Sequence, residues 1–230
     1  MTLGSRVLDA LDEVYDPELD QPITALGFVV ACEVSPDGDV VIRLQLPTPQ
    51  CAPNFAFLMA ADARAAVRRL PGVRSVTVRL DDHFTGAEIN DALDHDLGFA
   101  GAFPGETTDD ELASLRELFL RKALVARQSR LCEALQAAGE NVLGLRLGDL
   151  PEGAETRRCV ELRRRLGLSH DPDSPAFVLP NGDPIPDLPR WLRTARLVRT
   201  SLEVNGGICR SLLRVHRGVE IEDPEEVALR

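Results

Sequence analysis

Cys51 is the residue of this chain whose type and position are best suited to chemistry. It follows an apolar strand pattern that ends at Leu46 and precedes a helix expected to begin near Pro53. Peptide dipoles and free N–H groups at a helix N-terminus stabilise negative charge, so a thiol there is biased towards thiolate. Thiolates bind soft metals and attack electrophiles. The sequence therefore marks Cys51 as a candidate ligand or nucleophile.

Carboxylates and a histidine supply further candidate groups. Asp16 and Glu18 stand on the turn Asp16-Pro17-Glu18, where Pro17 disfavours helical geometry in the residue before it and so ends the first helix. His83 follows a strand pattern and lies in an acidic segment that runs to Asp96, and imidazole and carboxylate groups can hold iron, manganese or zinc. The alternative for this segment is a solvated acidic helix that joins two domains. His83 is kept as a candidate metal ligand.

Cys209 is the candidate ligand in the second half of the chain. Gly206 and Gly207 precede it closely, and glycines let a backbone approach a partner. A second ligand could therefore come from this segment. The alternative is that the two glycines form a hairpin turn between residues 201–204 and 208–215.

Periodic apolar patterns predict the elements that position Cys51. A helix that includes 7–14 is followed by a hairpin over 28–46, an amphipathic helix over 53–70 and a strand over 76–80. One side of the hairpin is buried, because apolar residues alternate along its second strand. The order is helix, strand, strand, helix, strand.

Several short motifs occur within this order: Asp16-Pro17-Glu18, Leu26-Gly27, Thr48 followed three residues later by Cys51, and Leu70-Pro71-Gly72-Val73. With them, residues 1–82 resemble the small iron–sulfur cluster assembly domain of the SufT and PaaD type. The resemblance implies a two-layer α+β domain whose single reactive cysteine helps to place metal or a cluster in client proteins. Cys51 would then be the thiolate ligand, Asp16 and Glu18 would shape or polarise the site, and Thr48 would order the loop by hydrogen bonding.

The remainder of the chain predicts a second domain of different character. Three glycines and a proline interrupt any periodicity over 98–105, and we interpret 99–105 as a linker. Residues 106–230 show long helical patterns that begin with a capping box at Thr108. The fold class expected is α+β, with an assembly-like domain over 1–98 and a mainly helical domain over 106–230.

Composition favours an intracellular accessory protein. The chain has 230 residues and 5 cysteines with no paired CxxC motif, which suits a reducing cytoplasm better than a disulfide scaffold. We expect Cys32, Cys132 and Cys159 to be inert packing residues. A formal net charge of −11 disfavours nucleic-acid binding, and neither a signal peptide nor a membrane span is expected.

The function expected is that of an accessory metal or iron–sulfur cluster assembly factor, not an enzyme. Its cargo would be iron or a cluster held transiently, and its partners a client metalloprotein and other assembly proteins, with a homodimer possible. The resemblance to family members of the phenylacetate-degradation type implies a di-iron or iron–sulfur oxygenase component as the client. One alternative is a cysteine-nucleophile enzyme with His83 as its base. Another is an interaction scaffold with a vestigial site, because Ala52 separates Cys51 from Pro53 whereas the family usually has cysteine followed by proline.

Overall fold

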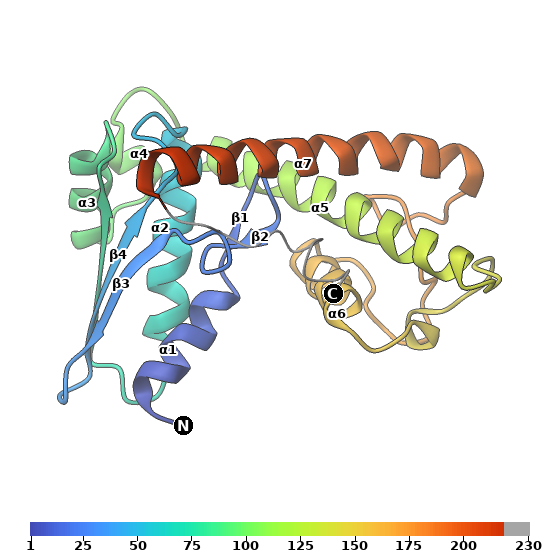
Figure 1. The fold of residues 1–230 in the computed structure, drawn as a ribbon, viewed down its shortest axis with the longest axis horizontal. Coiled ribbons are helices and arrows are strands. Elements are labelled where there is room, and N and C mark those ends of the chain that lie inside the picture. Colours follow the sequence, from blue (N-terminus) through green and yellow to red (C-terminus); the bar gives the residue numbers. More distant parts are fainter. Residues whose placement is uncertain (219–230) are drawn as a thin grey trace. The chain divides into compact units, whose positions relative to one another are not determined.

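The computed structural model describes residues 1–218 and divides into two compact units (Figure 1). The first unit comprises Met1–Ala113 together with the chain from Asn205 onward, and the second comprises Ser114–Val204. The boundaries fall inside two long helices, α5 (Asp109–Ala137) and α7 (Leu188–Arg217). This division differs from the expected boundaries at 98 and 106, because residues 205–218 belong to the first unit.

The first unit is built on a three-stranded sheet with the order β3 (Val29–Val34), β4 (Asp39–Gln45) and β5 (Ser75–Asp81). β3 and β4 are antiparallel, as expected of the hairpin, and β4 and β5 are parallel. Val40, Ile42 and Leu44 are buried along one face of β4, so the alternation in the sequence is realised in the fold.

Two helices lie along one side of this sheet, α1 (Leu3–Asp12) and α2 (Pro53–Arg68) (Figure 1). Val7 and Leu11 of α1 are fully buried, and α2 contributes a run of buried alanines with Met59 and Val67. Two further strands of two residues each, β1 (Tyr15–Asp16) and β2 (Gln21–Pro22), pair with one another after α1. The predicted order of elements and the α+β class are confirmed.

The acidic segment after β5 forms helix α3 (Gly86–Asp94). The side chain of Asn90 accepts from the Leu80 N–H at 2.8 Å and donates to the Leu80 carbonyl at 3.1 Å, so α3 pairs with an edge strand whose backbone groups would otherwise be open. Asp94 forms an ion pair with Arg79. Arginines from elsewhere in the unit thus offset part of the negative charge of this segment.

Residues 99–105, expected to be a linker, contain a short helix that packs in the core. Helix α4 (Phe99–Ala102) lies here, and both Phe99 and Ala102 are buried in the core of the first unit. The Phe99 ring centroid lies 5.4 Å from that of Phe57 and 4.9 Å from that of Phe103. The aromatic rings bury apolar surface that outweighs the turn preference of the glycines.

The second unit is mainly helical, with parts of α5 and α7, the short 3-10 helix η1 (Leu147–Asp149) and α6 (Ala154–Arg165). A buried polar clamp orders the loop after α6. Arg163, 1% exposed, donates to the carbonyls of Pro175 at 2.9 Å and Ala176 at 2.6 Å. Gln128 accepts from the Val178 N–H at 2.8 Å and donates to the Val178 carbonyl at 3.0 Å. These bonds satisfy backbone groups that the loop buries.

Helix α7 runs without interruption through Gly206 and Gly207. The hairpin considered for residues 201–215 is therefore wrong. Neither glycine has the positive φ that a tight hairpin turn of this kind requires. Packing of the helix outweighs the cost of about 1 kcal/mol that each interior glycine imposes on it.

Candidate functional site

Cys51 lies in the loop between β4 and α2, half-buried and one residue before the N-cap, Ala52. The loop is folded back on itself, because the Cys51 N–H donates to the Thr48 carbonyl at 3.3 Å. The Thr48 hydroxyl lies 3.7 Å from the Cys51 sulfur and also accepts from the Gln50 N–H at 3.3 Å. Thr48 thus contacts both the backbone and the thiol of the loop, in the position that the sequence analysis assigned to it.

His83 holds the same loop from the end of β5. Its Nε2 lies 2.8 Å from the Cys51 carbonyl, which can only accept, so Nε2 carries the proton. Nδ1 then accepts from the Thr85 N–H at 3.2 Å. Burial lowers the pKa of His83, in keeping with this neutral form, although the bond to the carbonyl opposes the shift. The structure gives His83 a positioning contact with Cys51, and its role as a ligand stays a prediction.

Asp16 is a buried carboxylate on the turn after α1. It accepts from the backbone N–H groups of Glu18 at 2.8 Å and Leu19 at 2.9 Å, which fixes the turn. Burial raises the pKa of Asp16 to about 6, and the charges of Glu18 and Asp20 act in the same direction, while the two backbone bonds oppose them. The site therefore contains a carboxyl group that changes charge close to neutral pH.

The end of α7 is attached to this turn. Asn205 donates to the Glu18 carboxylate at 3.2 Å, and Arg210 donates to the Gln21 side chain at 3.1 Å. Further along the helix, Leu213 is buried in the core of the first unit. These contacts join residues that lie almost 190 positions apart in the sequence.

Cys209 lies on the same stretch of α7 and is half-buried. Burial raises the pKa of Cys209 to about 12, and the negative charges of Asp16, Cys51 and Glu18 add to the shift, while Arg210 opposes it. The Asn205–Glu18 bond places this stretch of α7 beside the turn that carries Asp16 and Glu18, and Thr48 and His83 order the loop of Cys51. The roles assigned to these residues in the sequence analysis stay predictions.

The other cysteines lie away from this site. Cys132 and Cys159 are buried in the core of the second unit, and burial raises the pKa of Cys132 to about 11. Cys32 packs against the core of the first unit from β3, and burial raises its pKa. Their inertness stays a prediction, although each has the apolar surroundings of a packing residue.

Sequence reasoning missed Asn205, Arg210 and Gln21, which fasten α7 to the turn. Amide and guanidinium side chains on a helix have no local signature that names a distant partner. Within residues 1–218, no group of three or more histidine, cysteine, aspartate or glutamate side chains is arranged to hold a metal ion. In the same range, no helix has both the length and the apolar character needed to cross a bilayer.

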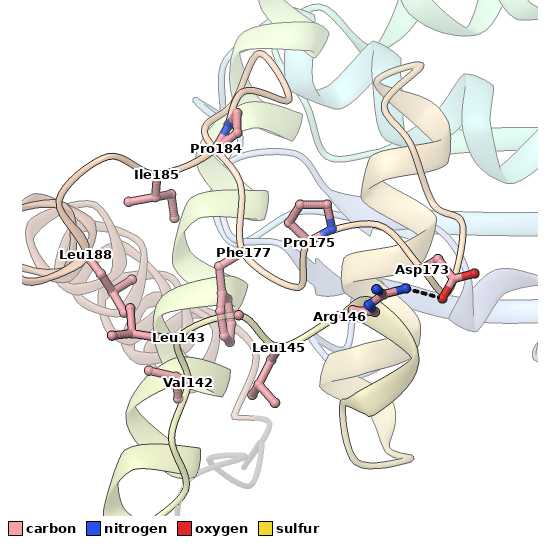
Figure 2. A pocket seen from close by; sticks show the side chains of 11 residues that line it. Val142, Leu143, Leu145, Arg146, Asp173, Pro175, Phe177, Pro184, Ile185 and Leu188 are labelled. Carbon is pink, nitrogen blue, oxygen red and sulfur yellow. Dashed lines mark hydrogen bonds and ion pairs between the residues drawn. The ribbon is translucent and has the colours of Figure 1, made fainter.

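The second unit contains a separate pocket of about 320 Å³ (Figure 2). Its walls are mainly apolar, with the buried ring of Phe177 beside Leu145, Ile185 and Leu188. At its edge an ion pair joins Arg146 to Asp173 at 2.6 Å. The pocket thus offers apolar surface with a polar margin.

Fold and site together define a two-layer α+β domain with a cysteine just before a helix. Residues 5–79 match the family model described as iron-sulfur cluster assembly protein. An uncharacterised protein of Methanocaldococcus jannaschii is 36% identical over 93 residues, which cover 40% of this chain and 96% of that protein. The Fe-S protein maturation auxiliary factor of Porphyromonas gingivalis is 32% identical over 74 residues, which cover 32% of this chain and 69% of that protein.

The chain belongs, through these residues, to the iron–sulfur cluster assembly protein family. The iron-sulfur cluster carrier protein of Mycobacterium tuberculosis is also similar, with 38% identity over 79 residues. That match covers 34% of this chain, which spans only 20% of the carrier's length. The resemblance inferred from the motifs around Cys51 is confirmed.

Proposed function

We propose that this protein is an accessory factor of iron–sulfur cluster assembly that passes metal or cluster to client proteins through the Cys51 thiolate. The observation that carries the proposal is the position of Cys51 within the family-matched residues, in a loop ordered by Thr48 and His83. Relatives over this region are named as a carrier protein and as a maturation auxiliary factor. Neither name describes an enzyme with small-molecule turnover.

The donors around Cys51 suit such a cargo. Thiolate sulfur is the ligand that iron–sulfur clusters take in proteins. We assign Asp16 and Glu18 the role of shaping or polarising the site with negative charge, which a bound cation would offset. Iron or a cluster is the cargo, and it completes its coordination with ligands from a client or from another chain.

His83 would position the loop and not act as a general base. Its Nε2 is directed at the Cys51 carbonyl and its Nδ1 at Thr85, so neither nitrogen is directed at the sulfur. A cysteine nucleophile needs a base within hydrogen-bonding reach of its thiol. The geometry therefore favours a carrier over the enzyme considered from the sequence.

The second unit would select the client. Its pocket presents Leu143, 69% exposed, beside apolar walls and the Arg146–Asp173 ion pair, a combination suited to an apolar segment of a partner protein. By resemblance to the phenylacetate-degradation members of the family, a di-iron or iron–sulfur oxygenase component is the client we propose. We further propose a cytoplasmic location, with other assembly proteins or a second copy as partners.

The test is iron retention by the full-length chain. Wild type, Cys51→Ser and the control Cys32→Ser are purified anaerobically from iron-supplemented cells. Iron and acid-labile sulfide are then measured per chain, together with visible absorption. We expect wild type and Cys32→Ser to hold iron and Cys51→Ser to hold none above background. Equal iron and absorption in all three proteins would refute a role for the Cys51 thiolate.

A further inference from the structure

Helix α7 has large apolar side chains on its exposed side as well as on its packed side. Leu202, Gly206 and Leu213 are buried and share one side of the helix. On the opposite side lie four apolar residues that are between 54% and 80% exposed, namely Leu197, Val204, Ile208 and Val215. Soluble monomers rarely leave a continuous apolar patch in contact with water. The exposed side of α7 therefore indicates a surface that a partner covers.

The spacing on this side of α7 is that of a helix that packs against another helix. Steps of four and three residues alternate along the exposed positions 197, 201, 204, 208, 211 and 215, which we call the exposed row. This alternation is the heptad repeat, which keeps one row of side chains facing a second helix. Four positions of the exposed row are apolar, and the other two, Ser201 and Ser211, are small. The covering partner is therefore expected to be a helix.

The exposed row is symmetric about residue 206. Positions 197 and 215, 201 and 211, and 204 and 208 are each equally far from that residue. A second copy of α7 that runs antiparallel across residue 206 would therefore place apolar side chains opposite apolar ones and serine opposite serine. Pairing of one surface with itself about a twofold axis is the commonest symmetry of homodimers. The helix that fits the exposed row is thus α7 of another copy of this chain.

The charges of α7 are compatible with this pairing and favour the antiparallel direction. No position of the exposed row is charged, and Arg196 and Arg199 form ion pairs with Glu133 of α5 instead. Arg190 lies one heptad before Leu197, so two parallel copies would place their Arg190 side chains opposite one another, and like charges so placed repel. In the antiparallel register the two Arg190 residues would lie about 48 Å apart. The antiparallel direction thus avoids a repulsion that the parallel direction imposes.

We propose that α7 forms an antiparallel, twofold interface with α7 of a second copy, centred on residue 206. The exposed row is about 27 Å long on a helix roughly 10 Å wide, which is less area than a permanent dimer buries. The association is therefore reversible and depends on protein concentration. This inference goes beyond the proposed function by naming the surface and its occupant. It does not depend on the cargo or on Cys51, so the iron measurements test the function and the experiments below test the interface.

Sedimentation equilibrium of the full-length chain over a range of concentrations measures the association. We expect wild type to approach twice the 25.1 kDa mass of one chain as its concentration rises. Ile208→Glu would bury two carboxylates in each dimer and should raise the dissociation constant at least about 10-fold. Leu118→Glu, the control, changes a similarly exposed apolar residue of α5 and should leave the constant unchanged. A monomeric wild type, or an Ile208→Glu variant that associates no more weakly than Leu118→Glu, would overturn the proposal.

Disulfide formation tests the register without a charged substitution. Ser201→Cys and Ser211→Cys are oxidised with diamide, which takes up the two thiol hydrogens as the S–S bond forms, each alone and as a mixture. We expect a linked dimer from the mixture, because position 201 of one copy would face position 211 of the other. Either variant alone should link no more than wild type, since its two new thiols would lie at least about 15 Å apart along the helices, too far for a disulfide. Linkage of either variant alone, or a mixture whose digest contains no 201–211 disulfide, would refute the antiparallel interface.

Discussion

At the scale of single residues, the environment of each cysteine decides whether its thiol can serve as a thiolate. Cys209 and Cys132 have their pKa raised to about 12 and about 11 by burial, with nearby negative charge adding to each shift. Cys51 lies at the start of a helix with a hydroxyl beside its sulfur. Cys209 and Cys132 are thus disfavoured as thiolates, and Cys51 is the thiol to which we assign the chemistry.

The difference between these thiol environments predicts the order in which the cysteines are alkylated. The pKa of Cys132 lies about 2 units above its ordinary value, which lowers the thiolate fraction at neutral pH about 100-fold. We expect iodoacetamide at neutral pH to label Cys51 first and Cys132 and Cys209 last, as followed by mass spectrometry of the digested chain. Labelling of Cys209 or Cys132 before Cys51 in the folded protein would contradict the assignment.

Asp16 predicts how stability changes with pH. Its pKa is raised in the folded protein from 3.8 to about 6, so its favourable contribution is present below about pH 4 and is lost as pH rises through about 6. Asp16→Asn can still accept the two backbone bonds but carries no charge. Relative to wild type, its unfolding free energy should therefore rise by up to about 3 kcal/mol between about pH 4 and 7.

Urea unfolding across this pH range measures the effect. Asp37, exposed in the turn before β4, offers the control variant Asp37→Asn. If the unfolding free energies of Asp16→Asn and wild type changed in parallel with pH, the Asp16 carboxyl would not ionise as described.

At the scale of elements, α7 brings its residues from Asn205 to Leu213 to the first unit. Gly206 and Gly207 are helical there, and a Cβ at Gly207 would meet no atom within 4 Å. Gly207→Ala should therefore stabilise the protein by up to about 1 kcal/mol, the difference in helix propensity. In a hairpin turn with positive φ, alanine would instead destabilise it. Thermal unfolding distinguishes the two outcomes by the sign of the change.

The packing of α7 also predicts that truncating one apolar side chain, that of Leu213, lowers the unfolding free energy strongly. Leu213 is 1% exposed and packs in the core of the first unit, so Leu213→Ala should cost about 2–5 kcal/mol of unfolding free energy. Val215, two residues further on, is 80% exposed, and Val215→Ala should change stability by less than about 0.5 kcal/mol. Equal effects in urea titrations would show that this side of α7 is not packed as described.

At the scale of the whole molecule, the first unit combines residues 1–113 with residues 205–218 of the described chain. A fragment of residues 1–100 lacks Ala102 and Leu213 of the core cluster, and also Leu112, which packs against it. Residues 1–113 joined by a flexible Gly/Ser linker to 205–218 should unfold roughly 10 °C higher than residues 1–113 alone. Identical transitions in calorimetry would show that the returning helix adds nothing to the unit.

The local pattern of apolar residues was sufficient to predict the helices and strands around Cys51. The alternation along β4 and the spacing along α2 each predict a buried face, and the structure has both. The return of α7 could not be predicted, because the Asn205–Glu18 bond joins residues with no shared periodicity. Gly98 to Gly105 indicated a linker, yet burial of Phe99 and Ala102 outweighed local turn preference.

If the Cys51 thiolate passes cluster to a client, loss of this thiol must abolish cluster transfer. Full-length wild type, Cys51→Ser and Cys32→Ser are incubated with a cluster donor and an apo iron–sulfur acceptor, and loading of the acceptor is followed spectroscopically. The Cys51→Ser side chain lies in a loop, so its thermal transition should match wild type. We expect wild type and Cys32→Ser to accelerate loading and Cys51→Ser to match the rate without added protein. Wild-type acceleration by folded Cys51→Ser would contradict the account.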